Sequence, residues 1–324
     1  MKRRLSIVML AVFLTVVFVL SGCSFIAKDK QAVSAKTDAY LQITDDIGRK
    51  VVVPKKPLRI VVLAPTFLDM LYGVGGKAVG RPTSKAPFQF AEAESLPDVG
   101  FTYNINTEKV LALQPDLVIA FQGMHEKLVP ILESSVIPVM VLKMKTYQDV
   151  LDKIALFGAI AGTQEQSERL AAELQKKIKE TASQLPEQSK KIVILHATAR
   201  SIPVELDNSI AGSIAAMLKL KNIASGIQPA DGESTTTPLS LEKLVQEDPD
   251  TIMVVTMGSR DTVEKRMNED LKSNPAWASL KAVKNGQVFF LPSELFLLNP
   301  GIRYHESVEY MAKVVYPEVY GHVR

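Results

Sequence analysis

Hydrophobic residues along the chain gather in short continuous runs, and each run is followed by a stretch with helical character. The runs lie at residues 59–63, 117–120, 139–142, 192–195, 251–255 and 288–291. Apolar runs without strict alternation are typical of strands covered on both faces, as in parallel sheets. The pattern therefore predicts an α/β fold with largely parallel sheets. Residues 45–53 differ from these runs and predict a short hairpin before the first of them.

A long amphipathic segment separates the first three runs from the last three. Residues 163–185 are rich in Glu, Gln, Lys and Ala and contain neither Gly nor Pro. Leu170, Leu174 and Ile178 follow one another at intervals of four, which places them on one face of a helix. At 1.5 Å per residue such a helix would span roughly 35 Å. We expect one stiff helix that links two lobes and is no flexible hinge.

The domain organisation follows from the place of this helix in the chain. Thr163 and Gln166 have the spacing of a capping box at its start. The lobes are then expected at residues 41–162 and 186–324. Both are Rossmann-like in the alternation of strand and helix, with parallel sheets.

The two halves also share a phrase, repeated at an offset of 134 residues. In the first half, Asn-Thr-Glu-Lys-Val-Leu at 106–111 leads to Pro-Asp-Leu-Val-Ile at 115–119. In the second, Ser-Leu-Glu-Lys-Leu-Val at 240–245 leads to Pro-Asp-Thr-Ile-Met at 249–253. Each copy has a helix-capping residue, an early glutamate, a Pro-Asp turn and a strand. The recurrence indicates two similarly built lobes.

The first 22 residues read as an export signal. Three cations at residues 2–4 precede an uncharged stretch at 5–20 and then Leu20-Ser21-Gly22-Cys23. The alternative is a membrane-spanning anchor, because 16 apolar residues approach the ~17 needed to cross a bilayer. Cys23, the only cysteine, decides between them, because the tetrad resembles the lipobox of bacterial lipoproteins. We expect cleavage before Cys23, its acylation (palmitate), a tether at residues 23–40 and a position on the extracytoplasmic face of the cell membrane.

Charge and length exclude some classes of protein. The formal net charge of +3 comes entirely from residues 2–4, and without the leader 302 residues carry 35 basic and 35 acidic side chains. A nucleic-acid binder held by bulk charge is therefore not expected. A chain of 302 residues also exceeds what one core usually supports, which favours two domains of about 150 residues.

A secreted enzyme is the alternative to a binding protein. The chain has no Gly-x-Ser-x-Gly elbow and no His-Glu-x-x-His motif, and it has only four histidines. The glycine-rich residues 73–78 follow a helical run and are more simply a helix end and turn. Asp, Glu and His do not gather in strand-end loops as a site for a bare metal ion requires. These absences favour a binding protein.

The lipobox, two α/β lobes, the long linking helix and the paired Glu…Pro-Asp phrases together resemble one family. It is the substrate-binding lipoproteins of ABC importers for iron complexes and cobalamin, and heme-receptor lipoproteins of Gram-positive bacteria resemble the chain most. The resemblance covers residues 43–320 and includes 96–100, 284–288 and Asn299-Pro300-Gly301 before Arg303. It implies a monomeric, non-enzymatic periplasmic binding protein for iron transport, with no cofactor of its own. It would deliver a small iron complex to an ABC permease and its ATPase.

Ligands of α/β proteins meet the loops at the carboxyl ends of the strands. In this chain those loops carry aromatic and thioether side chains, namely Phe88, Phe90, Phe101, Tyr103, Phe121, Met124, Met257 and Phe296. Such walls suit a large, partly apolar ligand. The single Trp277 lies away from the loops, and we expect it in the core.

Four side chains are candidate iron ligands: Tyr103, Met257, His125 and His196. A phenolate suits Fe(III), and tyrosine is an accepted axial ligand of heme. In similar heme-receptor lipoproteins the place of Tyr103 holds a heme-ligating methionine, and the place of Met257 holds a histidine. The resemblance therefore implies Tyr103 with Met257 as ligands of heme iron. Both could instead only line the site, and His125 or His196 could substitute.

Charged residues complete the expected site. Arg303 could clamp an anionic group such as a heme propionate, or it could simply pair with Glu306. The resemblance implies that Glu108 and Glu242 dock onto arginines of the permease. As an alternative, each is a carboxylate that favours a helix N-terminus.

The identity of the ligand stays open at this point. Heme is favoured over a ferric siderophore as the ligand, because a siderophore receptor would place several cations around its ligand. Four arginines could fill that role: Arg81, Arg200, Arg260 and Arg303. Cobalamin is the third possibility.

Overall fold

The computed structural model describes residues 39–323 apart from 85, 230–231, 233 and 271–273. These described residues belong to one compact unit. Cys23 and the predicted signal and tether up to residue 38 lie outside the described residues. Within the described part, no helix combines the length and apolar character that a bilayer crossing needs.

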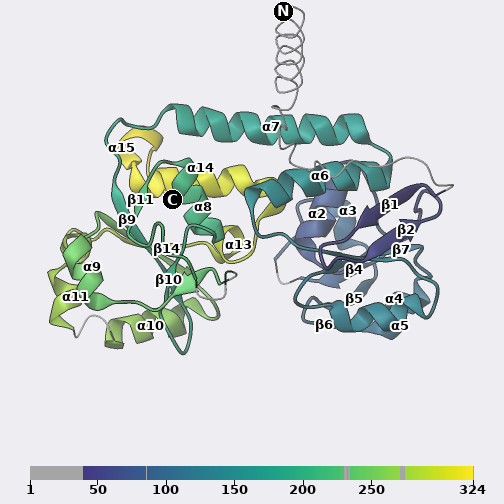
Figure 1. The fold of residues 1–324 in the computed structure, drawn as a ribbon, viewed down its shortest axis with the longest axis horizontal. Coiled ribbons are helices and arrows are strands. Elements are labelled where there is room, and N and C mark those ends of the chain that lie inside the picture. Colours follow the sequence, from purple (N-terminus) through teal and green to yellow (C-terminus); the bar gives the residue numbers. More distant parts are fainter. Residues whose placement is uncertain (1–38, 85, 230–231, 233, 271–273, 324) are drawn as a thin grey trace, which may run out of the picture. The chain divides into compact units, whose positions relative to one another are not determined.

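The N-lobe comprises the elements from β1 to α6 (Figure 1). Its strands are β1 (Leu41–Thr44), β2 (Lys50–Val53), β3 (Ile60–Val62), β4 (Arg81–Thr83), β5 (Asp98–Phe101), β6 (Asn104–Ile105), β7 (Leu117–Phe121) and β8 (Val139–Leu142). Its helices are α2 (Pro65–Gly73), α3 (Ala91–Glu94), α4 (Thr107–Ala112), η1 (Glu126–Leu128), α5 (Val129–Glu133) and α6 (Tyr147–Ala161).

The C-lobe comprises the elements from β9 to α15, and α7 (Gln164–Ser183) precedes it. Its strands are β9 (Lys191–Ala197), β10 (Val204–Glu205), β11 (Lys221–Asn222), β12 (Thr236–Thr237), β13 (Thr251–Thr256) and β14 (Val288–Leu291). Its helices are α8 (Ile210–Met217), α9 (Leu241–Glu247), α10 (Arg260–Asp270), α11 (Pro275–Ser279), α12 (Lys281–Lys284), α13 (Ser293–Phe296), η2 (Gly301–Arg303), α14 (Tyr304–Val315) and α15 (Pro317–Tyr320).

All six predicted strands are present, and they pair in parallel as expected. In the N-lobe the order is β3-β7-β8, and β3 also meets the segment before β4 through a bridge between Val61 and Gly80. In the C-lobe β9, β13 and β14 lie side by side in parallel. The predicted hairpin is also confirmed, although its first strand starts earlier, at Leu41. The α/β fold class with two parallel-sheet lobes is therefore confirmed.

The short strands were not predicted, because they contain no apolar run. The strands β4, β5 and β6 form a small sheet of their own, and β10 and β12 add antiparallel strands to the edge of the C-lobe sheet. Each is two to four residues long and polar in part. Neighbouring strands rather than local hydrophobicity define them.

The linking helix α7 is shorter than predicted and begins differently. It spans Gln164–Ser183, and the side chain of Thr163 makes no capping bond, so the predicted capping box is wrong. The reason lies in the preceding helix: Gly162 ends α6 in the left-handed conformation, and the Thr163 N–H closes that end by donating to the Gly158 carbonyl. A capping box does occur one helix earlier, between Thr146 and Asp149.

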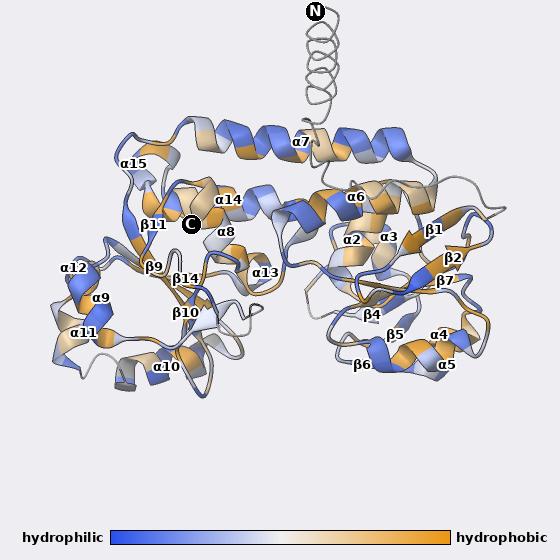
Figure 2. Ribbon diagram, viewed as in Figure 1, coloured by the Kyte–Doolittle hydropathy of each residue, from blue (hydrophilic) through white to orange (hydrophobic). Residues whose placement is uncertain are grey.

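One apolar cluster is shared by both lobes and α7, and we call it the shared core. The shared core includes Ile60 and Val62 of β3, and Ile192 and Ile194 of β9. The alternate residues of each strand point to the opposite face of the sheet, where they join a second apolar cluster within their own lobe. Leu174 and Ile178 join it from α7, which packs against α6 and α14. The predicted apolar face is thereby confirmed, while the rest of α7 is hydrophilic (Figure 2). Each sheet is thus covered on both faces, and α7 is bound to both lobes.

The repeated Pro-Asp phrase has the same structural role in each lobe. Asp116 accepts hydrogen bonds from the N–H groups of Leu58 and Arg59, each at 2.8 Å, and its own N–H donates to the Arg59 carbonyl. Asp250 does the same with Lys191, whose N–H lies 2.7 Å from its carboxylate. In both lobes the aspartate fixes the start of the neighbouring parallel strand, which explains why the phrase recurs.

The Asn299-Pro300-Gly301 sequence forms one of the contacts between the lobes. Thr66 on α2 donates to the Asn299 carbonyl at 3.3 Å, and the Asn299 amide donates to the Thr146 carbonyl at 3.4 Å. Gly301 has a φ of +58°, and a Cβ at this position would lie 2.7 Å from a methyl carbon of Thr66. Glycine is required here because the two lobes approach too closely for a side chain.

The carboxylate of Asp69 and the guanidinium group of Arg303 interact electrostatically at this junction. Asp69 on α2 accepts a hydrogen bond from the Gln89 N–H at 3.1 Å and lies in the field of Arg303 from the C-lobe. Burial raises the pKa of Asp69 from 3.8 to about 6, against the lowering effects of the Gln89 bond and the Arg303 charge. The charged carboxylate is therefore a source of instability at neutral pH.

We expect Asp69→Asn to stabilise the protein at pH 8. Well above pH 6 the aspartate is charged in both states and loses hydration on folding, whereas well below pH 3.8, its unfolded-state pKa, it is neutral in both. Because the group is partly exposed, we discount the shift and expect a gain of about 1 kcal/mol at pH 8 that falls to about 0.2 kcal/mol at pH 4. Urea unfolding at the two pH values measures this, with the exposed Asp152→Asn as control. An equal effect at both pH values would contradict the assignment.

Candidate functional site

The carboxyl edge of the N-lobe presents Tyr103 on a tight turn between β5 and β6. The side chain is 77% exposed and stacks on Phe101, with ring centroids 5.4 Å apart and planes at 8°. Gly100 permits the turn, because it has a φ of +104° and a Cβ there would lie 2.5 Å from the Asn104 carbonyl. Tyr103 is therefore a phenol held at the protein surface by ring stacking and a constrained backbone.

The buried ring of His125 supports this turn through a hydrogen bond and is not available as an iron ligand. It is 1% exposed, and its Nδ1 accepts from the Phe121 N–H at 2.8 Å. The Nε2 atom consequently carries the proton and donates to the Thr102 carbonyl at 2.6 Å. Burial lowers the pKa of His125 and keeps the ring neutral. Both ring nitrogens are bonded to the backbone, so neither is free to bind iron in this structure.

The C-lobe brings Met257 and His196 together at the carboxyl ends of adjacent strands. Met257 follows β13, is 58% exposed and donates its N–H to the Ala197 carbonyl at 2.9 Å. His196 lies near the end of β9 opposite Val255, on the same face as Ile194. The thioether and the imidazole thus lie on neighbouring strand ends of this lobe, with Met257 two positions beyond the register partner of His196. Tyr103 belongs to the other lobe.

Arg303 is already paired within its own helical turn. Its Nε and a terminal nitrogen donate to one carboxylate oxygen of Glu306, at 3.0 and 2.7 Å. The bond to Glu306 raises the pKa of Arg303. The local pairing considered in the sequence is present, and it leaves other guanidinium donors for a ligand.

The apolar walls are less extensive than the sequence indicated. Phe88 and Phe296 are buried in the shared core, whereas Met124 is exposed. Trp277 is buried in the second C-lobe cluster, as expected. In the part of the chain that the structure describes, no three His, Cys, Asp or Glu side chains gather to hold a bare metal ion.

Glu108 and Glu242 occupy equivalent places in the two lobes. Each lies in the first turn of a short helix whose capping residue, Asn106 or Ser240, accepts the backbone N–H of the following lysine. Both carboxylates are exposed. Their equivalence follows from the repeated phrase and suits a partner that contacts both lobes.

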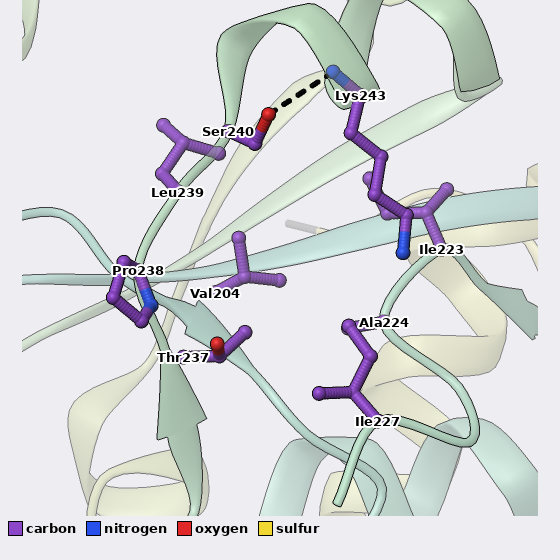
Figure 3. Close-up of a pocket in the computed structure, with 9 residues that line it drawn as sticks. All are labelled: Val204, Ile223, Ala224, Ile227, Thr237, Pro238, Leu239, Ser240 and Lys243. Carbon is purple, nitrogen blue, oxygen red and sulfur yellow. Dashed lines mark hydrogen bonds between the residues drawn. The ribbon is translucent and has the colours of Figure 1, made fainter. Parts of the chain in front are cut away.

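An apolar pocket lies between β10, β12 and the start of α9 (Figure 3). Val204, Ile223, Ile227 and Leu239 line it, and Ser240 accepts the Lys243 N–H at its rim. It holds about 40 Å³, which is room for a few water molecules. The pocket is too small for a metal complex, and Tyr103, Met257 and His196 are not among its lining residues.

Sequence reasoning missed two residues of this region. Gly301 was noted only as part of a family phrase, although a glycine directly after Asn-Pro could have indicated a close backbone approach. Glu205, which contacts His196 at 2.9 Å, gave no signal because it lies on a two-residue strand.

The comparisons agree with the fold described above. A model of the periplasmic binding protein family matches residues 60–295. The Fe(3+)-citrate-binding protein YfmC of Bacillus subtilis is 28% identical, over 97% of both chains. The putative ABC transporter substrate-binding lipoprotein YhfQ of the same organism is 26% identical, over 80% of this chain and 83% of its own.

A solved structure of IsdE from Staphylococcus aureus, complexed with heme, superimposes with a TM-score of 0.67 at 21% identity. It covers 80% of this chain and 98% of its own. This likeness concerns the fold. The family match over residues 60–295 shows that the chain belongs to the periplasmic binding protein family. Members of this family are non-enzymatic substrate-binding components of ABC transporters, and they carry a transported ligand rather than a cofactor.

Proposed function

We propose that the protein captures heme at the carboxyl ends of its strands, with one lobe on each face of the ligand, for uptake of iron. The observation that carries the proposal is Tyr103, an exposed phenol on a constrained turn and stacked on Phe101. A tyrosinate is an accepted axial ligand of ferric heme. The flat Phe101 ring beside it suits a planar, partly apolar ligand.

The C-lobe offers the second face of the ligand. Met257 and His196 lie on adjacent strand ends, and both side chains are of types that bind heme iron. Arg303 would receive a propionate through the guanidinium donors that Glu306 leaves unused. The proposed ligand set is thus Tyr103 from the N-lobe and Met257 or His196 from the C-lobe.

A ferric complex of a carboxylate or siderophore is the second candidate. It is supported by the similarity over almost the whole chain to a protein named for Fe(3+)-citrate, and by the exposed Arg200. Arg81 donates to the Pro82 and Glu94 carbonyls, whereas Arg303 pairs with Glu306 through only part of its guanidinium group. The exposed phenol of Tyr103, stacked on the flat ring of Phe101, favours heme over such an anion.

The proposal includes an anchor and a transport partner. After removal of residues 1–22, acylated Cys23 would hold the protein on the extracytoplasmic face of the membrane, with residues 23–40 as tether. Lobes at 41–162 and 186–324, joined by the helix in 163–185, would act as a monomer. The exposed Glu108 and Glu242, one on each lobe, would dock onto cations of the ABC permease that works with its ATPase.

We expect Tyr103→Phe to weaken hemin binding by tenfold or more and to shift the Soret band. The variant keeps the ring stacked on Phe101 and removes only the oxygen that would bind iron. Titration with hemin, followed by visible absorption, measures both effects, and Ile131→Ala provides an exposed control on the same lobe. Wild-type protein that binds ferric citrate but not hemin would establish the second candidate instead. An unchanged spectrum in Tyr103→Phe would remove tyrosine ligation.

We expect the double variant Glu108→Ala/Glu242→Ala to abolish uptake of the iron complex while its affinity for the ligand stays unchanged. The reason is that both carboxylates are exposed and neither belongs to the proposed set of iron ligands. Cellular uptake and hemin titration are measured in parallel, with Glu168→Ala/Glu187→Ala as a control for the loss of two exposed charges. Weakened hemin binding, or uptake at the wild-type rate, would contradict the docking role.

A further inference from the structure

His196 and Glu205 form a side-chain pair beside the proposed ligand site. The Nδ1 atom of His196 lies 2.9 Å from Oε1 of Glu205, which reaches it from the antiparallel strand β10. The Glu205 side chain is 5% exposed, whereas that of His196 is 21% exposed. A buried carboxylate therefore holds a ring that reaches the surface.

The pair determines which ring nitrogen is free. Because a carboxylate oxygen accepts, the Nδ1 atom of a neutral His196 donates, and its Nε2 atom carries the lone pair. Nε2 has no hydrogen-bond partner in the described part of the chain and is not among its buried unpartnered atoms. His196 thus offers a metal-binding nitrogen at the protein surface. His125 is the opposite case, because both of its nitrogens are bonded to the backbone.

Apart from the bond to His196, the carboxylate of Glu205 is poorly satisfied in its hydrogen bonding. Its second oxygen, Oε2, is buried and has no hydrogen-bond partner among the described residues. A buried carboxylate with one bond is costly. Iron bound to Nε2 would draw electron density from the ring, make Nδ1–H a stronger donor and so strengthen the bond to Glu205. The pair would thus be better stabilised with metal bound than without it.

We propose that His196, oriented by Glu205, is the C-lobe ligand of the heme iron, and that Met257 only lines the site. Metal-binding histidines usually donate their second ring nitrogen to a carboxylate or carbonyl, and His196 has this arrangement already. Glu205 is then a positioning residue, because it acts on iron only through the imidazole. This inference rests on the proposed binding of heme.

The test compares hemin complexes of variants of the full chain. We expect His196→Ala to shift the Soret band and to weaken hemin binding at least tenfold, and added imidazole to restore the wild-type spectrum. Glu205→Gln should weaken binding by about 10–100-fold, the usual cost of losing a partner of a metal ligand. Met257→Ala should leave the Soret band in place. The controls are His322→Ala and Glu309→Gln, which change an exposed histidine and a surface glutamate.

Each remaining outcome overturns the inference in a recognisable way. A wild-type spectrum for His196→Ala together with a shift for Met257→Ala would assign the iron to Met257 and leave heme binding intact. Normal hemin affinity in Glu205→Gln would remove the positioning role. Failure of wild-type protein to bind hemin would overturn the proposed function and this inference with it. Thermal unfolding of each variant without hemin separates loss of ligation from loss of fold, and imidazole rescue requires a folded protein.

Discussion

The structure depends on a single apolar cluster that both lobes and α7 share. Ile60 and Val62 of the N-lobe, Leu174 and Ile178 of α7, and Ile192 of the C-lobe all belong to it. Exposing one such side chain costs about 1.5–3 kcal/mol, so separating the lobes from α7 would forfeit several of these contributions at once. Gly301 against Thr66 adds a contact between the lobes. The strands of both lobes therefore pack on one continuous core, which fixes the positions of their ends.

This constraint explains how exposed side chains can be held in place. Tyr103 is at the surface, yet Phe101 stacks on it and His125 fixes the preceding carbonyl from the interior. On the other lobe, buried Glu205 holds the half-buried His196. In both cases a polar bond made in the interior orients a group of the proposed ligand site. Binding groups fixed in this way lose little freedom when the ligand arrives, which favours affinity.

The sequence predicts the elements that depend on local pattern. The six apolar runs are strands, residues 170, 174 and 178 do mark the buried face of α7, and the Pro-Asp phrase recurs because Asp116 and Asp250 each fix a neighbouring strand. What the sequence does not predict depends on contacts between distant segments. Thr163 closes α6 instead of capping α7, and His125 is bonded to a carbonyl 23 residues away. Glu205 meets His196 only because β10 turns back along β9.

The central claim, that an iron complex is held at the strand ends of both lobes without disturbing their shared core, is tested most directly by amide hydrogen exchange. The full chain would be measured with and without hemin. The account predicts slower exchange on loading at residues 101–103, 196–198 and 256–258, with α7 exchanging equally slowly in both states. Protection confined to the pocket beside α9, or faster exchange of α7 in the loaded protein, would contradict it.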